Sequence, residues 1–144
     1  MTFTKWPRLG LVARFVGMGD ALISSMGFAT NSAFIPILVG KGHLIISGKF
    51  NHPSICVGVR QSGSHVCMFK HNDMKHLEGL LCEVISQGQP KTHRPWKKFL
   101  VIVEGLYSME GTMVDLPRII ELKCANLCTF CALLNCIYAV LSLH

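Results

Sequence analysis

Short apolar runs alternate with longer segments of helical periodicity through the middle of the chain. Three runs, at residues 43–47, 65–69 and 99–104, are rich in Ile, Val, Leu and Phe. Such runs are typical of buried parallel strands. Strands that alternate with helices predict an α/β domain with a mainly parallel sheet and flanking helices.

The segments between these runs predict helices. Residues 53–61 begin with Pro53, which the first turn of a helix tolerates because its N–H needs no partner there. Residues 72–87 place apolar side chains on one face at spacings of three and four, and Asn72 or Asp73 can cap this helix. A last helix is predicted to begin near Leu116. The basic segment between Pro90 and Pro95 has the composition of a connecting loop, which we do not expect to pack in the core.

Composition narrows the class of protein. The chain has 144 residues, 50% of them hydrophobic and 15% charged, against about 25% charged in an average soluble protein. One domain, or part of a larger one, fits this length, and extended disorder does not. The net charge is +6, but the basic residues are scattered except around Trp96, and no nucleic-acid motif accompanies them. We therefore expect no nucleic-acid partner.

The cysteines indicate a reducing compartment. There are seven, an odd number, and four of them crowd into the C-terminal segment with the spacing C-x3-C-x2-C-x4-C. A secreted disulfide domain usually shows an even, distributed set. The spacing also lacks the paired C-x2-C units of a convincing zinc site, so no metal site is predicted. No uninterrupted apolar core of a secretory signal is found at the start of the chain.

The C-terminal segment differs from the rest of the chain in charge. Residues 124–143 contain no Asp, Glu, Lys or Arg, and 20 such residues are about the length of a helix that spans a bilayer. Asn126 and Asn135 weaken a membrane-anchor interpretation. We favour another origin, translation past a missed exon boundary, and whether the segment also inserts in a membrane stays a separate question.

Three elements could carry chemistry. Gly27 comes just before a stretch that can continue as a helix to about Leu38, where backbone N–H groups could hold an anion. His52 follows the first predicted strand, and Ser108 lies in the loop after the third. Alone, each is more typical of a turn, a surface cap or an ordinary loop. Together they share one topological position, the carboxyl edge of an open sheet, where ligands of α/β folds bind.

Five ordered segments carry a family resemblance: MGFATN, NHPS, FKHND, QPKTHRPWKK and VEGLYSMEGTMVDLP. In this order and spacing they resemble the α-oxoamine synthases, and within them the catalytic long-chain-base subunits of serine palmitoyltransferase. The resemblance implies an incomplete large domain of a fold type I pyridoxal-phosphate-dependent transferase, with mainly parallel sheet. It covers residues 11–123, a domain of aminotransferase class I/II type, and leaves residues 1–10 and 124–144 as divergent segments.

The resemblance also implies an activity and a site. The expected cofactor is pyridoxal 5'-phosphate (PLP), and the expected reaction is the decarboxylating condensation of L-serine with palmitoyl-CoA to 3-ketosphinganine. Gly27 and Phe28 would offer backbone N–H groups to the cofactor phosphate. His52 would stack on the pyridine ring and contact the substrate carboxylate, and Ser108 would lie near the phenolic oxygen. A serine palmitoyltransferase subunit 1 partner and the cytosolic face of the endoplasmic reticulum membrane are expected.

Departures from the family pattern qualify these expectations. Pro53 restricts the backbone of His52, and His71, Asn72 and Asp73 match a family motif but are expected to end a strand and cap a helix. None of the nine lysines lies in a segment that resembles the Schiff-base motif, and no segment matches the family's Asp-Glu-Ala-His. We therefore do not expect catalysis by this chain alone. A non-catalytic form that acts through partner binding or membrane association is the alternative. Unpaired apolar sheet edges also predict poor solubility.

Overall fold

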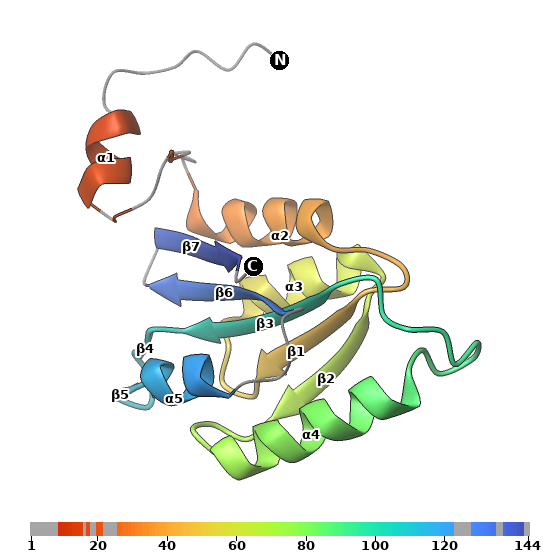
Figure 1. Ribbon diagram of the computed structural model, residues 1–144. Coiled ribbons are helices and arrows are strands. Elements are labelled where there is room, and N and C mark those ends of the chain that lie inside the picture. The colour runs from red at the N-terminus through yellow and green to blue at the C-terminus, as the bar shows by residue number, and fades with distance from the viewer. Residues whose placement is uncertain are drawn as a thin grey trace.

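A five-stranded sheet with helices on both faces forms the centre of the molecule (Figure 1). The computed structural model describes residues 9–15, 17, 20–21, 26–122, 128–134 and 137–142. The strand order of this sheet is β2-β1-β3-β6-β7, and all pairs of neighbouring strands are parallel except β6 with β7. The predicted α/β class is confirmed. The predicted domain boundaries, after residue 10 and after residue 123, stay predictions, and the second lies outside these ranges.

The three predicted strands form within one residue of the expected positions. β1 (Leu44–Gly48) pairs with β2 (His65–Phe69) on one side and with β3 (Phe99–Glu104) on the other. β1 is buried throughout, and so is β3 except for its last residue. The expectation that β2 is also buried is wrong: His65, Val66 and Met68 are exposed, because β2 lies at the edge of the sheet.

Two apolar cores lie on opposite faces of the sheet. On one face, α2 (Gly27–Leu38) and α3 (Pro53–Ser62) cover Ile45, Leu100 and Ile102. On the other, α4 (Met74–Gln87) and α5 (Leu116–Glu121) cover Leu44, Ile46 and the alternate residues of β3. This three-layer arrangement is visible in Figure 1. Because side chains alternate across a strand, apolar residues at successive positions of β1 serve both cores.

Local signals fix the helix starts. His52 caps α3, and its extended backbone (φ −56°, ψ 144°) suits a residue before proline. Pro53 occupies the first turn as predicted, and Gly63, with φ 68°, ends the helix in the left-handed conformation. Asp73 caps α4, accepting a hydrogen bond from the His76 N–H at 2.9 Å. The expected capping role of Asp73 is thereby confirmed.

The loop between α4 and β3 is packed, contrary to expectation. Trp96 is 8% exposed, belongs to the core beneath α4, and donates its indole N–H to the Val84 carbonyl at 2.9 Å. The Gln89 N–H donates to the Arg94 carbonyl at 2.9 Å, which closes the loop on itself. Gly88 has φ 67°, and a Cβ there would lie 2.8 Å from the Arg94 carbonyl oxygen. The composition of the loop did not predict this packing, because it does not show that the Trp96 side chain is buried in the core.

The described part of the C-terminal segment forms two strands. β6 (Cys128–Leu134) pairs with β3, and β7 (Ile137–Ser142) pairs with β6. β3 is therefore an interior strand, and the edges of the sheet are β2 and β7. Among the described residues, no helix is long and apolar enough to cross a membrane. The remaining elements are α1 (Leu9–Phe15) and a hairpin of β4 (Leu106–Tyr107) and β5 (Thr112–Met113).

Candidate functional site

The first turn of α2 presents backbone N–H groups for which the described part of the chain supplies no partner. Gly27 begins the helix, no side-chain hydrogen bond caps it at Met26, and no acidic residue lies in its first turn. Gly27 and Phe28 are exposed. The first N–H groups of a helix lack intrahelical partners and carry partial positive charge. The position suits an anion, and the predicted binding of a phosphate there stays a prediction.

A buried contact connects α2 with α3. The Asn31 side-chain N–H group donates to Ser54 Oγ at 2.5 Å, and both side chains are buried. Close approach is possible because Gly58 faces α2: a Cβ there would lie 2.5 Å from the Asn31 carbonyl oxygen. The Asn31 Oδ1 has no hydrogen-bond partner among the described residues. The N-terminal parts of α2 and α3 are thus held side by side, and the Asn31 Oδ1 is an acceptor that these contacts do not use.

The His52 ring is oriented by the first turn of the helix that it caps. Its Nδ1 lies 2.7 Å from Ser54 Oγ and accepts a hydrogen bond from the Ser54 N–H at 3.2 Å. The residue is exposed, and no described residue forms a hydrogen bond with its Nε2. Through Ser54, His52 joins the same contact that reaches Asn31 on α2. The structure therefore brings together the helix of Gly27 and Phe28 with His52, as the sequence predicted.

The backbone of His52 is tied to the end of β3. Its N–H donates to a carboxylate oxygen of Glu104. Burial raises the pKa of the Glu104 carboxyl above its ordinary value, and the hydrogen bond from His52 opposes this shift. A carboxylate at this point connects the residue after β1 with the last residue of β3. The sequence predicted Glu104 as the last residue of a strand but indicated no role for its side chain.

Asn51 and Tyr107 form a second connection that sequence reasoning missed. The Asn51 side-chain N–H group donates to Ser47 Oγ at 2.9 Å and to the Ile102 carbonyl at 2.8 Å. The Tyr107 hydroxyl donates to Asn51 Oδ1 at 3.1 Å and accepts from the Glu104 N–H at 3.2 Å. Both side chains are buried. Buried polar groups that are fully hydrogen-bonded rigidify a structure, so Asn51, the residue directly before His52, is held in place.

The residues after β2 support the hairpin of β4 and β5. His71 lies edge-on to the Tyr107 ring, with centroids 4.5 Å apart, and its Nε2 is 2.9 Å from Thr112 Oγ1. Asn72 donates to the Met113 carbonyl and accepts from the Asp115 N–H. The predicted structural role of His71 and Asn72 is consistent with these contacts, although both act on the hairpin and only Asp73 caps a helix.

Ser108 lies in the turn of the same hairpin. It is exposed, and the described residues offer it no hydrogen bond. Its neighbour Tyr107 reaches Asn51, beside His52, so the turn belongs to the same end of the sheet. No direct contact joins Ser108 to His52 or to the first turn of α2 within the described ranges. Its predicted proximity to a cofactor oxygen stays a prediction.

The arrangement is that of an α/β protein with an uncapped helix N-terminus and an exposed imidazole at the carboxyl ends of parallel strands. Such an edge is where open α/β sheets bind ligands. Residues 10–143 match the family model described as aminotransferase class I and II. The chain therefore belongs to the aminotransferase class I and II family.

Curated relatives resemble the chain over about three quarters of its length. The chain is 55% identical over 113 residues to serine palmitoyltransferase 2 of Dictyostelium discoideum, covering 78% of this chain and 23% of that protein. It is 61% identical over 110 residues to long chain base biosynthesis protein 2a of Oryza sativa subsp. japonica, covering 76% and 22%. The chain thus spans about a fifth of the length of these relatives.

Solved structures agree with this assignment. A variant of serine palmitoyltransferase from S. paucimobilis with bound PLP–myriocin aldimine superposes with a TM-score of 0.73 at 27% identity, over 86% of this chain and 30% of that one. The Sphingomonas wittichii serine palmitoyltransferase gives a TM-score of 0.74 at 25% identity, over 86% and 29%. These likenesses confirm the predicted type of fold.

Proposed function

We propose that this chain forms part of the cofactor cleft of a PLP-dependent serine palmitoyltransferase, which condenses L-serine with palmitoyl-CoA, with loss of carbon dioxide, to 3-ketosphinganine. The observation that carries the proposal is the Asn31–Ser54–His52 contact, which sets an uncapped helix N-terminus beside an oriented imidazole. Identities of 55% and 61% to the relatives named above support the reaction class. The PLP bound to the S. paucimobilis enzyme, a structural neighbour, supports the cofactor.

The residues present fit a phosphorylated aromatic cofactor. The Gly27 and Phe28 N–H groups would bind its phosphate, the His52 ring would stack on its pyridine ring, and the Ser108 hydroxyl would donate to its phenolic oxygen. When bound, PLP supplies an electron sink for carbanion chemistry at the substrate. This chain's own residues bind and orient: Ser54 holds the His52 ring, and Glu104 holds the His52 backbone. A site held by packed elements in this way is preorganised for binding.

Binding of pyridoxamine 5'-phosphate, measured by calorimetry, tests the cofactor assignment. This analogue has no aldehyde and cannot form Schiff bases with surface lysines. We expect saturable binding that weakens at least about tenfold, or 1.4 kcal/mol, for pyridoxamine, which lacks the phosphate. Gly27→Pro should also weaken binding, because it removes one N–H donor at a helix position that proline tolerates.

Two substitutions at His52 separate its ring from its capping role. His52→Asn keeps a side chain that caps helices well, whereas His52→Ala loses the cap. Both should weaken binding of pyridoxamine 5'-phosphate equally if the ring stacks on the cofactor. Equal affinity for pyridoxamine and its phosphate, or full affinity in His52→Asn, would contradict the proposed site.

Activity is expected to need residues that the chain does not contain. None of its nine lysines lies in a segment resembling the family's Schiff-base motif. The purified chain supplied with PLP, radiolabelled L-serine and palmitoyl-CoA should therefore form no 3-ketosphinganine above a no-protein control. Product formation by the chain alone would overturn this part of the proposal.

We further propose a location and a partner. The chain would lie at the cytosolic face of the endoplasmic reticulum membrane and associate with serine palmitoyltransferase subunit 1, as its resemblance to the catalytic subunits implies. Its identity to proteins named serine palmitoyltransferase 2 motivates the search for this partner. A tagged chain should sediment with endoplasmic reticulum membranes and should co-purify with subunit 1 from detergent extracts. Recovery of the chain in the soluble fraction would contradict the location, and absence of subunit 1 would contradict the partnership.

A further inference from the structure

The outer edge of β2 carries unpaired backbone groups. Among the described residues, β2 pairs only with β1. The His65 N–H donates to the His43 carbonyl, and the Phe69 carbonyl accepts from the Lys49 N–H. Because the N–H and C=O of one strand residue point to the same side, Val66 and Met68 direct theirs away from β1. The backbone N–H and C=O groups of these two residues can form hydrogen bonds with an additional strand.

This edge lacks the usual devices that prevent strand addition. Exposed edges are commonly protected by Lys, Pro or a bulge, and residues 65–69 contain neither residue type, while the pairing with β1 is continuous. The Val66 and Met68 side chains are 38% and 66% exposed. A strand laid beside β2 would cover both of them on the face of α3.

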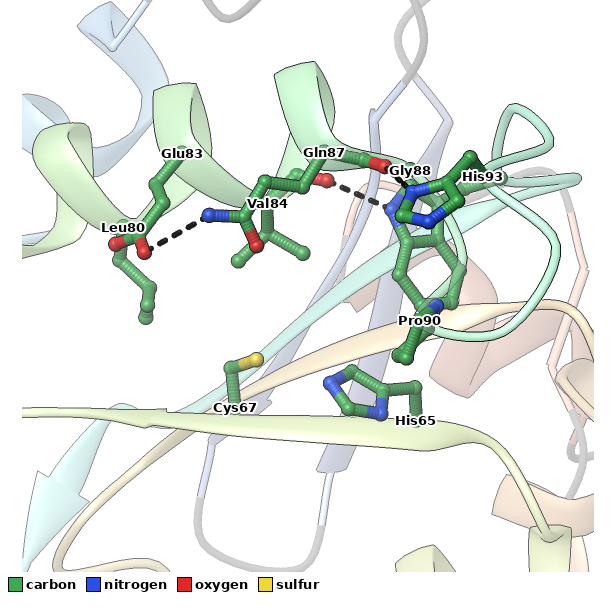
Figure 2. A pocket seen from close by; sticks show the side chains of 10 residues that line it. His65, Cys67, Leu80, Glu83, Val84, Gln87, Gly88, Pro90 and His93 are labelled. Atoms are coloured by element: carbon green, nitrogen blue, oxygen red, sulfur yellow. Dashed lines mark hydrogen bonds between the residues drawn. The ribbon is translucent and has the colours of Figure 1, made fainter.

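On the opposite face, a cavity of about 470 Å³ lies between β2 and α4 (Figure 2). His65 and Cys67 form its floor from β2, Leu80 and Val84 line it from α4, and Pro90 and His93 from the loop that follows. His65 also stacks on Trp96, with ring centroids 5.4 Å apart. Side chains of an added strand that point to this face would enter the cavity, because side chains alternate along a strand.

One end of this edge is basic. Lys91 and Arg94 flank the lining residues Pro90 and His93 in sequence, are exposed, and form no ion pair with any residue that the structure describes. Their loop is closed by backbone hydrogen bonds, so the cations are held on a packed support near the His65 end of β2. A strand that binds at this edge should therefore carry carboxylates at the end that lies beside these two cations, because opposite charges attract.

We propose that the β2 edge binds an extended peptide segment of another protein by strand addition, with apolar side chains at alternate positions and acidic residues at the end beside Lys91 and Arg94. The backbone of Val66 and Met68 supplies the hydrogen bonds. The cavity under α4 receives one or two apolar side chains, and the basic loop sets the orientation. The site is separate from the cofactor cleft and does not depend on its assignment.

Two acetylated and amidated peptides test the proposal, Glu-Glu-Val-Thr-Val-Thr-Val-Thr and its reverse. Fluorescence titration follows Trp96, with Trp6→Phe leaving it as the single tryptophan. We expect one of the two orientations to bind, with hydrogen exchange slowed at the Val66 and Met68 amides. Replacing both Lys91 and Arg94 by Glu should weaken binding at least about tenfold, or 1.4 kcal/mol.

Variants at the edge separate pairing from surface apolarity. Met68→Pro removes an outward N–H without touching the pairing with β1, which edge strands tolerate, and it should abolish binding. Met68→Lys should also abolish it. Met113→Lys is the matched control, since Met113 is 70% exposed in β5, and it should bind normally. Circular dichroism and urea denaturation report whether each variant is folded.

Three results would overturn the proposal. The first is that neither peptide binds the folded chain. The second is unchanged binding to Met68→Pro, which would place the peptide elsewhere. The third is self-association of the chain that Met68→Lys abolishes and that excludes the peptides, because a second copy would then be the occupant.

Discussion

β1 and β2 are neighbouring five-residue strands, paired in parallel over their full length, yet their environments differ. All five residues of β1 are buried, whereas three of the five residues of β2 are exposed. Both sequences are apolar, LIISG and HVCMF. The difference lies in what flanks them: β1 has strands on both sides and helices on both faces, and β2 has one neighbouring strand. Position in the sheet, more than apolarity, determines what each strand contributes.

The largest change in stability is expected from a matched pair of substitutions, one in each strand. Ile45 and Val66 are partners in register, on the same face of the sheet, with 0% and 38% exposure. Ile45→Ala should lower the free energy of unfolding by about 2–5 kcal/mol, since it opens a cavity in the core. Val66→Ala should cost less than about 1 kcal/mol, because its side chain is already partly in water. Urea denaturation measures both, and similar losses would break the comparison.

A second pair compares the residues that follow each strand. Asn51 is buried with three side-chain hydrogen bonds, and Asn72 is exposed with two. Asn51→Ala should lower the free energy of unfolding by about 2–3 kcal/mol, since it removes a hydrogen-bond partner from the buried Tyr107 hydroxyl and from the Ile102 carbonyl. Asn72→Gly, which accepts the φ of 53° at that position, should cost less than about 1 kcal/mol. A greater loss at Asn72 than at Asn51 would reverse the expected order.

The helix caps give a smaller effect. Asp73→Ala should lower the stability of the chain by about 1 kcal/mol, because the His76 N–H loses its partner. Asp73→Asn, which keeps an oxygen acceptor, should restore most of this. Thermal unfolding followed by circular dichroism compares the two variants. Equal losses in both would mean that the charge of Asp73, rather than its cap, is what stabilises α4.

The smallest expected effect is a pH dependence. Burial raises the pKa of Glu104 above its ordinary value of 4.5. A carboxyl whose pKa is higher in the folded state stabilises the fold when protonated, and this contribution is lost as pH rises through the raised pKa. Stability should therefore decline slightly above pH 4.5, and Glu104→Gln should flatten the decline. An unchanged slope in Glu104→Gln would assign the pH dependence to other groups.

The sequence predicted those features that depend on local signals. Strand runs, the start of α3 at Pro53 and the cap at Asp73 all follow from residues close to one another. Gly27 and His52 were found by their position next to predicted elements. The link between them through Asn31 and Ser54 spans 23 residues and depends on how α2 packs on α3, which no local pattern reports.

Other features needed the tertiary structure for the same reason. Asn51 and Tyr107 meet across 56 residues of sequence, and nothing near either residue indicates the other. The exposure of β2 follows from strand order, which an apolar run does not encode. The uncharged C-terminal segment had the length of a membrane helix, but its described residues pair with β3 and with each other.

The order of the strands also has a consequence for synthesis on the ribosome. β1 and β2 are joined by the short α3, so this unit can pair soon after it emerges, with little loop-closure entropy to overcome. The other edge of β1 pairs with β3, which follows only after the 50 residues 49–98. At about 5–20 residues per second, that edge stays without its partner for roughly 3–10 s. β1, which is buried over its whole length in the folded chain, is thus exposed for several seconds while the chain is being made.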